Sequence, residues 1–216
     1  MRGSDVNRLS EDYDILAEEY AARYLHELEH KPFDRQMLDR LCAVAAPLGA
    51  ICDMGCGPGQ IARYMKDRGA DVVGMDLSPG MVALAGKLHP DIAFSRGDML
   101  ALDVPDESWG GVAAFYSIIH VPPASVVSAL TEIRRVLKPG GYLLVSFHLG
   151  NDTMLVEALW GKQVSLEFFF YQRQEVEASM EKADLEVVES RERDPYPDVE
   201  YQSRRGYILA RRRRAH

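Results

Sequence analysis

The residues best suited to bind a ligand are a glycine-rich segment and two aspartates that follow it along the chain. The glycines occupy every second position directly after the apolar residues 50–54: Gly55, Gly57 and Gly59. Glycine allows a sharp turn and a close approach of the backbone to a ligand. Asp76 and Asp98 each come at the end of a further predicted strand. Because the carboxyl ends of parallel strands share one edge of a sheet, we expect the loop and both carboxylates to form one site.

The spacing of this segment excludes two common phosphate-binding loops. A dinucleotide-binding loop needs a third small residue where Gln60 stands, and a Walker loop needs a Gly-Lys-Ser/Thr sequence that does not follow here. A carboxylate at Asp76 can accept hydrogen bonds from both hydroxyls of a ribose. Asp98 can accept one from the exocyclic amine of an adenine. Two neighbouring acids repel a pyrophosphate, so they indicate a nucleoside without phosphates and suit a ligand with positive charge.

Strands that alternate with helices must position these residues. Short apolar segments predict strands at 50–54, 71–75, 92–95, 111–117 and 142–147. Helical spacing predicts helices at about 10–28, 33–46, 60–67, 79–88 and 122–137. Ser10 is the expected N-cap of the first helix, and residues 138–141 are an expected turn. This alternation indicates an α/β fold in which a parallel sheet carries helices on both faces.

The C-terminal part does not continue the alternation. Its pattern predicts a short extra strand at 164–171, a helix at 174–182, and two last strands at 185–190 and 207–211. No helix fits between the last two strands, so we expect them to be antiparallel. The aromatic run from Phe168 to Tyr171 is expected to pack on the core, to line a substrate pocket or to form a dimer edge.

In combination these segments resemble the motifs of the class I S-adenosylmethionine-dependent methyltransferases, in particular the broad bacterial group with small-molecule substrates. The likeness is carried by residues 51–59, 73–78, 97–100, 112–120 and 137–141, and it covers about residues 10–211. The resemblance implies a Rossmann-like sheet of seven strands, mostly parallel with the last strand antiparallel. It also implies that residues 1–46 form an N-terminal helical lid on a methyltransferase domain at 47–216, within a single globular unit.

The same resemblance implies contacts with S-adenosylmethionine, position by position. Asp76 would hold the ribose hydroxyls, Asp98 would border the adenine, and Asp53 would meet the amino group of the methionine part, directly or through water. Tyr13 and Tyr20 resemble residues of a helix that covers the bound cofactor. The complete set of expected cofactor contacts is Tyr13, Tyr20, Asp53, Gly55, Cys56, Gly57, Pro58, Gly59, Asp76, Leu77, Ser78, Gly97, Asp98, Met99, Tyr116 and Ser117.

Two histidines are candidate catalytic bases. His120 follows the fourth predicted strand, where the resemblance places it facing the transferring methyl, and His148 follows the fifth. A neutral imidazole there can take a proton from a hydroxyl or amine nucleophile. The alternative for His120 is a structural role at the start of the helix that Pro122 opens. Positioning of the acceptor can itself supply most of the rate, so neither base is obligatory.

The predicted activity is methyl transfer to a small molecule, with an oxygen or nitrogen nucleophile preferred. Enzymes that methylate a pyrimidine carbon use a cysteine near the fourth motif, and no cysteine follows Cys56. Amine-directed DNA methyltransferases carry Asp/Asn-Pro-Pro-aromatic, whereas Val121 and Ala124 flank the two prolines here. The net charge of −8 also disfavours nucleic acid. Two alternatives are a non-catalytic module that binds the cofactor and a nicotinamide oxidoreductase, which Gln60 and Asp98 disfavour.

Length and composition set the remaining expectations. A chain of 216 residues that is 47% hydrophobic suits one α/β domain, as a monomer or homodimer. Its three cysteines are too few for a disulfide framework and lack metal-ligand spacing. A polar, acidic N-terminus and the lack of any apolar stretch near the roughly 20 residues of a membrane span predict a cytoplasmic protein without membrane contact. Residues 211–214, all arginine, are expected to be a solvated tail.

Overall fold

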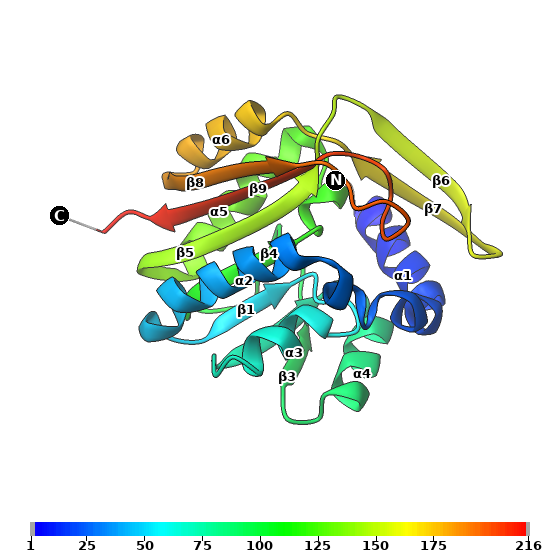
Figure 1. Cartoon of the computed structure of the whole chain (residues 1–216), viewed down its shortest axis with the longest axis horizontal. Coiled ribbons are helices and arrows are strands. Elements are labelled where there is room, and N and C mark those ends of the chain that lie inside the picture. The colour runs from blue at the N-terminus through cyan, green and yellow to red at the C-terminus, as the bar shows by residue number, and fades with distance from the viewer. Residues whose placement is uncertain (1–2, 215–216) are drawn as a thin grey trace.

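A computed structural model describes residues 3–214, and its centre is a sheet of seven strands in the order β3-β2-β1-β4-β5-β9-β8 (Figure 1). The strands are β1 (Ile51–Met54), β2 (Val72–Asp76), β3 (Ala93–Arg96), β4 (Trp109–Phe115), β5 (Leu137–His148), β8 (Leu185–Arg193) and β9 (Arg205–Arg212). Neighbouring strands from β3 to β5 are parallel, and β9 is antiparallel to both β5 and β8. The predicted seven-stranded, mostly parallel α/β fold with an antiparallel last strand is therefore confirmed.

Helices cover both faces of this sheet, as predicted (Figure 1). They are α1 (Gly3–Tyr24), α2 (Pro32–Ala45), α3 (Gln60–Lys66), α4 (Pro79–Leu88), α5 (Val126–Val136) and α6 (Arg173–Lys182). One buried cluster joins α5 and α6 to one face, and a second joins α2 and α3 to the other. Helix α1 lies apart from both clusters and packs against α4 through a small cluster of its own. The carboxyl edge of the parallel strands is thereby left beneath α1.

Three predicted boundaries in the parallel half are wrong. Helix α1 begins at Gly3, so Ser10 lies inside it and is not its N-cap; the Ser10 hydroxyl instead donates to the Leu77 carbonyl at 3.1 Å. Residues 138–141 are not a free turn, because β5 already starts at Leu137, which pairs with Trp109 before a bulge at Gly140 (φ 83°). Residues 123–125 form a separate 3-10 turn before α5.

A two-stranded hairpin stands outside the main sheet. It consists of β6 (Thr153–Leu159) and β7 (Lys162–Phe169), which are antiparallel, and it lies beside α1 in Figure 1. Residues Val164 and Leu166 of β7 pack with Leu16 of α1 in one buried cluster. The strand predicted at 164–171 is therefore found as β7, whereas β6 was not predicted. The hairpin and α1 together form a wall over the carboxyl edge of the sheet.

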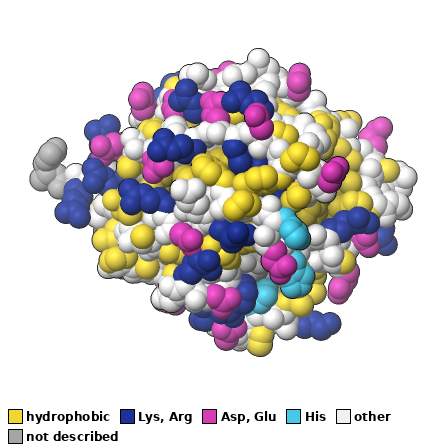
Figure 2. Space-filling view, in the orientation of Figure 1, with side chains coloured by type: hydrophobic (Ala, Val, Ile, Leu, Met, Phe, Trp, Pro, Cys, Tyr) yellow, Lys and Arg dark blue, Asp and Glu magenta, His cyan; other side chains and the backbone are white. Residues whose placement is uncertain are grey.

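The arginines at the C-terminal end are not a free tail. Arg211 and Arg212 belong to β9 and form ion pairs with Glu186 at 2.7 Å and Glu107 at 2.9 Å. Arg212 also donates to main-chain carbonyls, among them that of Leu137. Figure 2 shows the basic side chains gathered at the end of the molecule from which the C-terminus leaves. Among residues 3–214, no helix combines the length and apolar character needed to cross a membrane.

Candidate functional site

The glycine segment leaves β1 in a conformation that side chains disfavour. Gly55, Gly57 and Gly59 all have positive φ, at 74°, 51° and 88°. A Cβ at Gly55 would lie 2.4 Å from the Cβ of Ser117, whereas the space beside Gly57 is open as far as a ring carbon of Tyr20 at 3.7 Å. The segment therefore turns tightly against β4 and leaves its middle part free to approach a ligand.

Asp76 ties this loop to the end of β2. Its Oδ2 accepts a hydrogen bond from the Gly57 N–H at 2.8 Å, and its Oδ1 accepts one from the Ser78 N–H at 2.9 Å. Burial raises the pKa of the carboxyl above its ordinary value, against the effect of these two donors. Each oxygen keeps one lone pair, so the fixed carboxylate can still accept from two neighbouring hydroxyls.

A first cavity of about 110 Å³ opens above Asp76. It is lined by Tyr13, Tyr20, Gly55, Gly57, Asp76, Leu77, Ser78, Gly97, Asp98, Met99, Tyr116, Ser117 and His120 among the predicted residues. Asp98 Oδ1 accepts from the Leu100 N–H at 2.9 Å, while no described residue donates to its Oδ2. The Ser117 hydroxyl is buried and has no hydrogen-bond partner within residues 3–214. Both atoms are polar groups to which a ligand can bind.

Four predicted contacts lie outside this first cavity. Asp53 is 1% exposed and accepts from the Ala62 N–H at 2.9 Å, and burial raises its pKa to about 8. Pro58 and Gly59 are buried as well, and a Cβ at Gly59 would meet Phe94 at 2.9 Å. Cys56 lines a neighbouring cavity, and burial raises the pKa of its thiol. A direct contact between Asp53 and a cofactor amine remains a prediction.

Helix α1 closes the first cavity through polar contacts. Asp14 accepts from the Ser78 hydroxyl at 2.5 Å and from the Gly80 N–H at 2.7 Å, at the N-terminus of α4. A carboxylate is favoured there because the first N–H groups of a helix carry partial positive charge. Asp12 of the same helix accepts from the Ser165 N–H of β7 at 2.9 Å. These contacts hold Tyr13 and Tyr20 of α1 over the site.

His120 is half-buried, and both its ring nitrogens are engaged. Its Nδ1 lies 2.8 Å from the Glu167 carbonyl, which only accepts, so Nδ1 carries the hydrogen. Its Nε2 therefore accepts from the Tyr13 hydroxyl at 2.6 Å. Burial lowers the pKa of His120 to about 4, which keeps the ring neutral near pH 7. The structure thus joins His120 to Tyr13, a pairing that the sequence does not reveal.

A second cavity of about 350 Å³ adjoins the first. Tyr13, Tyr20, Gly55, Gly57 and Tyr116 line both cavities. Rings dominate the walls of the second: Tyr13, Tyr20, Tyr24, Phe115, Tyr116, His148, Trp160, Phe168 and Tyr201. Of the predicted aromatic run, Phe168 is therefore in a pocket wall. The residues shared by the two cavities make this a continuous site with two compartments.

His148 lines the second cavity, apart from His120. Its Nδ1 lies 2.7 Å from the Ser203 hydroxyl oxygen, which already accepts from Arg205. The Ser203 hydroxyl can donate to Nδ1 or accept from it with its second lone pair, so this contact is compatible with either tautomer of His148. Burial lowers the pKa of His148 to about 3, and the charge of Arg205 adds to the effect. The ring is therefore neutral near pH 7.

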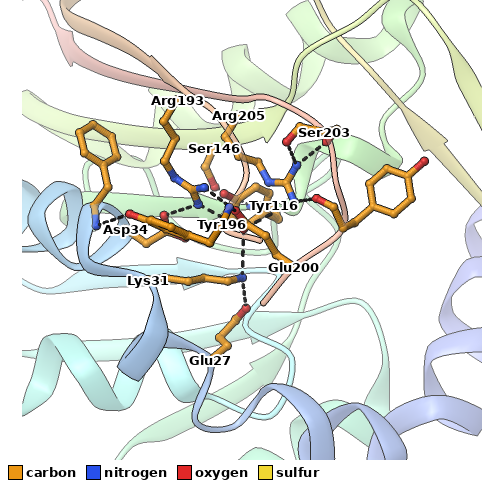
Figure 3. Close-up of polar contacts among 12 residues, drawn as sticks. Glu27, Lys31, Asp34, Tyr116, Ser146, Arg193, Tyr196, Glu200, Ser203 and Arg205 are labelled. Carbon is orange, nitrogen blue, oxygen red and sulfur yellow. Dashed lines mark hydrogen bonds and ion pairs between the residues drawn. The ribbon is translucent and has the colours of Figure 1, made fainter. Parts of the chain in front are cut away.

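A buried network of six charged side chains lies against the second cavity (Figure 3). Its members are Glu27, Lys31, Asp34, Arg193, Glu200 and Arg205, with side chains between 1% and 14% exposed. Arg193 joins Asp34 at 2.8 Å to Glu200, and Lys31 lies 2.5 Å from Glu27 and 3.6 Å from Glu200. Although burial lowers the pKa of Lys31, the charge of Glu27 raises it above its ordinary value.

None of these six residues was predicted as part of the site. They come from the segment before α2, from α2 itself and from the β8–β9 region, so contacting partners lie from 4 positions apart (Glu27 and Lys31) to 169 positions apart (Lys31 and Glu200). No motif spacing marks such a set, because the fold alone brings it together. The one local signal is the concentration of charged and aromatic residues in the β8–β9 loop around Tyr196 and Glu200.

Comparison with known proteins shows which family this fold is similar to. Residues 51–141 match the family model described as "Methyltransferase domain". A demethylmenaquinone methyltransferase of Beutenbergia cavernae is 37% identical over 127 residues, which are 59% of this chain and 51% of the relative. A malonyl-[acyl-carrier protein] O-methyltransferase of Enterobacter lignolyticus is 30% identical over 138 residues, which are 61% of this chain and 53% of the relative. The chain thus spans about half the length of these curated relatives.

A solved structure extends the likeness to almost the whole chain. Magnesium protoporphyrin IX methyltransferase from Synechocystis PCC 6803, with bound SAM, superposes with a TM-score of 0.70 and covers 96% of this chain and 97% of its own. At 16% identity, this likeness shows the fold alone. The fold, the glycine loop and the family match agree, and together they show over residues 51–141 a methyltransferase domain similar to those of the class I S-adenosylmethionine-dependent family, whose cofactor is S-adenosylmethionine.

Proposed function

We propose that this protein transfers a methyl group from S-adenosylmethionine to an oxygen or nitrogen atom of a small molecule. The observation that carries the proposal is the pair of adjoining cavities, one with nucleoside-binding carboxylates and one with aromatic walls. The cofactor supplies a methyl group on a sulfonium, which is its own activated leaving group. The chain therefore needs to hold the acceptor in line, exclude water and take up one proton.

The first cavity offers partners for each polar part of such a cofactor. Asp76 has two free lone pairs for ribose hydroxyls, and Asp98 Oδ2 is free for an adenine amine. The buried Ser117 hydroxyl, which lacks a partner among the described residues, stands beside Gly55 for the methionine part. Two acids line this cavity, with no lysine or arginine among its described lining residues. That charge suits a cationic ligand without phosphates.

Proton uptake is assigned to His120 acting through Tyr13. The His120 Nε2 lone pair is occupied by the Tyr13 hydroxyl, and Tyr13 lines both cavities. An acceptor hydroxyl in the second cavity would pass its proton to Tyr13 Oη, while the Tyr13 proton moves to His120 Nε2. The Glu167 carbonyl, which accepts from Nδ1, stabilises the imidazolium that results. A general base is needed only for an acceptor that binds protonated.

Other expectations accompany this proposal. The two relatives above act, by their names, on demethylmenaquinone and on a malonyl group of an acyl-carrier protein. Because these two relatives act on different acceptors, the acceptor of this chain has to be inferred from the residues of the second cavity. The helical lid at residues 1–46, the monomeric or homodimeric state, the lack of nucleic-acid binding and the cytoplasmic location remain predictions.

Cofactor binding gives the first test. We expect calorimetry to show saturable binding of S-adenosylmethionine by the full chain, and Asp76→Ala to weaken it by at least 100-fold, about 3 kcal/mol, because two charge-assisted hydrogen bonds are lost. Asp71→Ala is the matched control, since Asp71 is exposed at the opposite end of the same strand region. Binding that is absent in the wild-type chain, or equal in both variants, would contradict the proposal.

Turnover gives the second test and separates an enzyme from a module that only binds the cofactor. The purified chain is incubated with S-adenosylmethionine and a small-molecule fraction of a cell extract, and release of S-adenosylhomocysteine is measured. Release that depends on the extract supports catalysis. Tight cofactor binding without release from any fraction would favour the non-catalytic alternative.

A further inference from the structure

We infer that the second cavity binds an aromatic acceptor that carries a carboxylate or another anionic oxygen, with the ring against the wall of Tyr20, Tyr24 and Trp160 and the oxygen beside Lys31 and Arg205. This inference rests on the proposed function, because it takes the second cavity as the place of the acceptor. Lys31 and Arg205 both line that cavity, although each residue is 5% exposed or less.

One wall of the cavity is made of three rings in mutual contact. Trp160, at the tip of the β6–β7 hairpin, has its ring centroid 6.2 Å from that of Tyr20 and 5.9 Å from that of Tyr24. Tyr20 and Tyr24 are 4.6 Å apart and tilted. Aromatic rings pair edge to face or in offset stacks, so a wall of such rings favours contact with a flat ring over a bulky saturated group.

The anionic side chains at the charged end already accept from donors of this chain. Glu27 accepts from Lys31 and, at 2.9 Å, from the Gln60 amide. Glu200 accepts on one oxygen from Arg193 and from the Tyr196 N–H at 2.8 Å, and on the other from Arg193 at 3.2 Å. A ligand cation placed here would compete with these buried partners. An ammonium group is therefore a poor match to this end of the cavity.

The donors, in contrast, are not exhausted. Arg205 uses its terminal nitrogens on Ser203 and on the Tyr201 carbonyl at 2.7 Å, while its Nε is buried without a partner among residues 3–214. Lys31 has three N–H groups for two carboxylates. Spare hydrogen-bond donors of this kind call for an acceptor atom on the ligand.

The network itself is neutral, because Lys31, Arg193 and Arg205 face Glu27, Asp34 and Glu200. Both Lys31 and Arg205 lie near the ring of Tyr116, at 5.7 Å and 5.5 Å, and Tyr116 borders the first cavity too. The two cations that line the second cavity therefore lie at the end that adjoins the first.

Three probes with one ring system test the inference without knowledge of the natural substrate. The full chain, saturated with S-adenosylhomocysteine so that the first cavity is filled, is titrated with 1-naphthoate, 1-naphthalenemethanol and 1-naphthylmethylammonium. We expect calorimetry to give a dissociation constant for naphthoate at least tenfold below those of the other two. Equal or tighter binding of the ammonium, or no binding of naphthoate, overturns the inference. Failure to bind S-adenosylhomocysteine instead contradicts the proposed function.

Two variants test which residues cause the preference for naphthoate. Arg205→Gln should remove the advantage of naphthoate over the alcohol, whereas Trp160→Ala should weaken all three probes alike. Arg204→Gln is the matched control, because Arg204 is 58% exposed and lies outside both cavities. A folded Arg205→Gln that keeps the full naphthoate preference overturns the assignment. If Arg205→Gln fails to fold, the comparison of the three probes on the wild-type chain still decides the ligand chemistry.

Discussion

At the level of single residues, the most informative arrangement is the hydrogen bond between Tyr13 and His120. Sequence reasoning identifies His120 as a candidate base, but it cannot show that the lone pair of Nε2 is already engaged at 2.6 Å. The partner lies 107 positions away and on the helix that covers the site. Any proton that reaches His120 must pass through Tyr13 or displace it. The catalytic unit is therefore a pair of residues.

Removing the Tyr13 hydroxyl should slow catalysis, while the chain still binds the cofactor. Once an acceptor is known, we expect Tyr13→Phe and His120→Gln each to lower kcat by about 100-fold, which is the lower end of the usual contribution of general base catalysis. The reason is that neither variant can take up the proton of the acceptor through the Tyr13–His120 pair. Calorimetry should show that cofactor affinity falls far less than kcat, by no more than about tenfold, since Tyr13 also belongs to the cover over the first cavity. Tyr64→Phe, which changes a hydroxyl paired with Asp39 far from the site, is the control. An unchanged kcat in both variants would remove the pair from the mechanism.

Asp53 provides a test through stability. Burial raises its pKa from 3.8 to about 8, so the folded state binds a proton that the unfolded state has released, and stability present below pH 3.8 is lost as the pH rises toward about 8. Asp53→Asn keeps an acceptor for the Ala62 N–H and removes the charge. We expect it to raise the free energy of unfolding at pH 8 by on the order of 2 kcal/mol, measured by urea denaturation. The gain should vanish near pH 4.

At the level of elements, α1 covers the first cavity and is held there by a small set of side-chain hydrogen bonds. Its contacts with the rest of the site are Ser10 to Leu77, Asp14 to Ser78 and Gly80, and Tyr13 to His120. All of them reach the ends of strands or the start of α4, which are the places that also form the first cavity. Cofactor binding and the closure of α1 are therefore expected to be coupled, since one set of groups serves both.

Asp14→Ala should loosen this cover. The change removes an anion from the N-terminus of α4 together with acceptors for the Ser78 hydroxyl and the Gly80 N–H. We expect a cofactor affinity about tenfold weaker, equivalent to ~1.4 kcal/mol, with faster amide hydrogen exchange confined to α1. Glu18→Ala, at an exposed position of the same helix, should leave both unchanged. Unaltered exchange in Asp14→Ala would show that Asp14 does not hold the helix.

The elements also show which sequence signals are reliable. The strands that carry the loop and the two aspartates are short, apolar and followed by glycine or aspartate, so β1, β2 and β3 were predicted to within a few residues. Strand β6 was not, because its residues are mostly half-exposed or exposed and its strongest partner is β7 rather than the core. The bulge that lets β5 start at Leu137 likewise depends on pairing with Trp109, and Gly140 is its one local signal in the sequence.

At the level of the whole molecule, buried neutral histidines make stability depend on pH. Burial lowers the pKa of His120 from 6.5 to about 4 and that of His148 to about 3. The unfolded chain therefore binds these protons first, so stability present above pH 6.5 is lost as the pH falls toward about 4. For His120 alone the effect is on the order of 3 kcal/mol.

Replacing both histidines should flatten this dependence. We expect the double variant His120→Gln/His148→Gln to lose clearly less unfolding free energy between pH 7 and pH 4 than the wild-type chain, as measured by chemical denaturation at several pH values. His26→Gln is the control, since His26 is 77% exposed. Parallel curves for wild type and double variant would show that neither ring is held neutral by the fold.

The sequence predicts the first compartment of the site far better than the second. Asp76, Asp98 and the glycine segment sit at the ends of consecutive strands, so topology alone places them together. Lys31, Glu200 and Arg205 meet only because the β8–β9 loop folds back over the start of α2, and that depends on long-range packing. The chemistry of the cofactor is thus encoded locally, whereas the chemistry of the acceptor is encoded by the tertiary fold.

The two tryptophans occupy opposite settings, and this gives the protein an optical property. Trp109 is 7% exposed in the core cluster beneath α5, whereas Trp160 stands in the wall of the second cavity with the Arg23 guanidinium 5.0 Å from its ring. The fluorescence of Trp109 should therefore not respond to a ligand in the second cavity, whereas that of Trp160 should. A change in the emission that disappears in Trp160→Phe would report, in real time and without a label, the arrival of a molecule in that compartment.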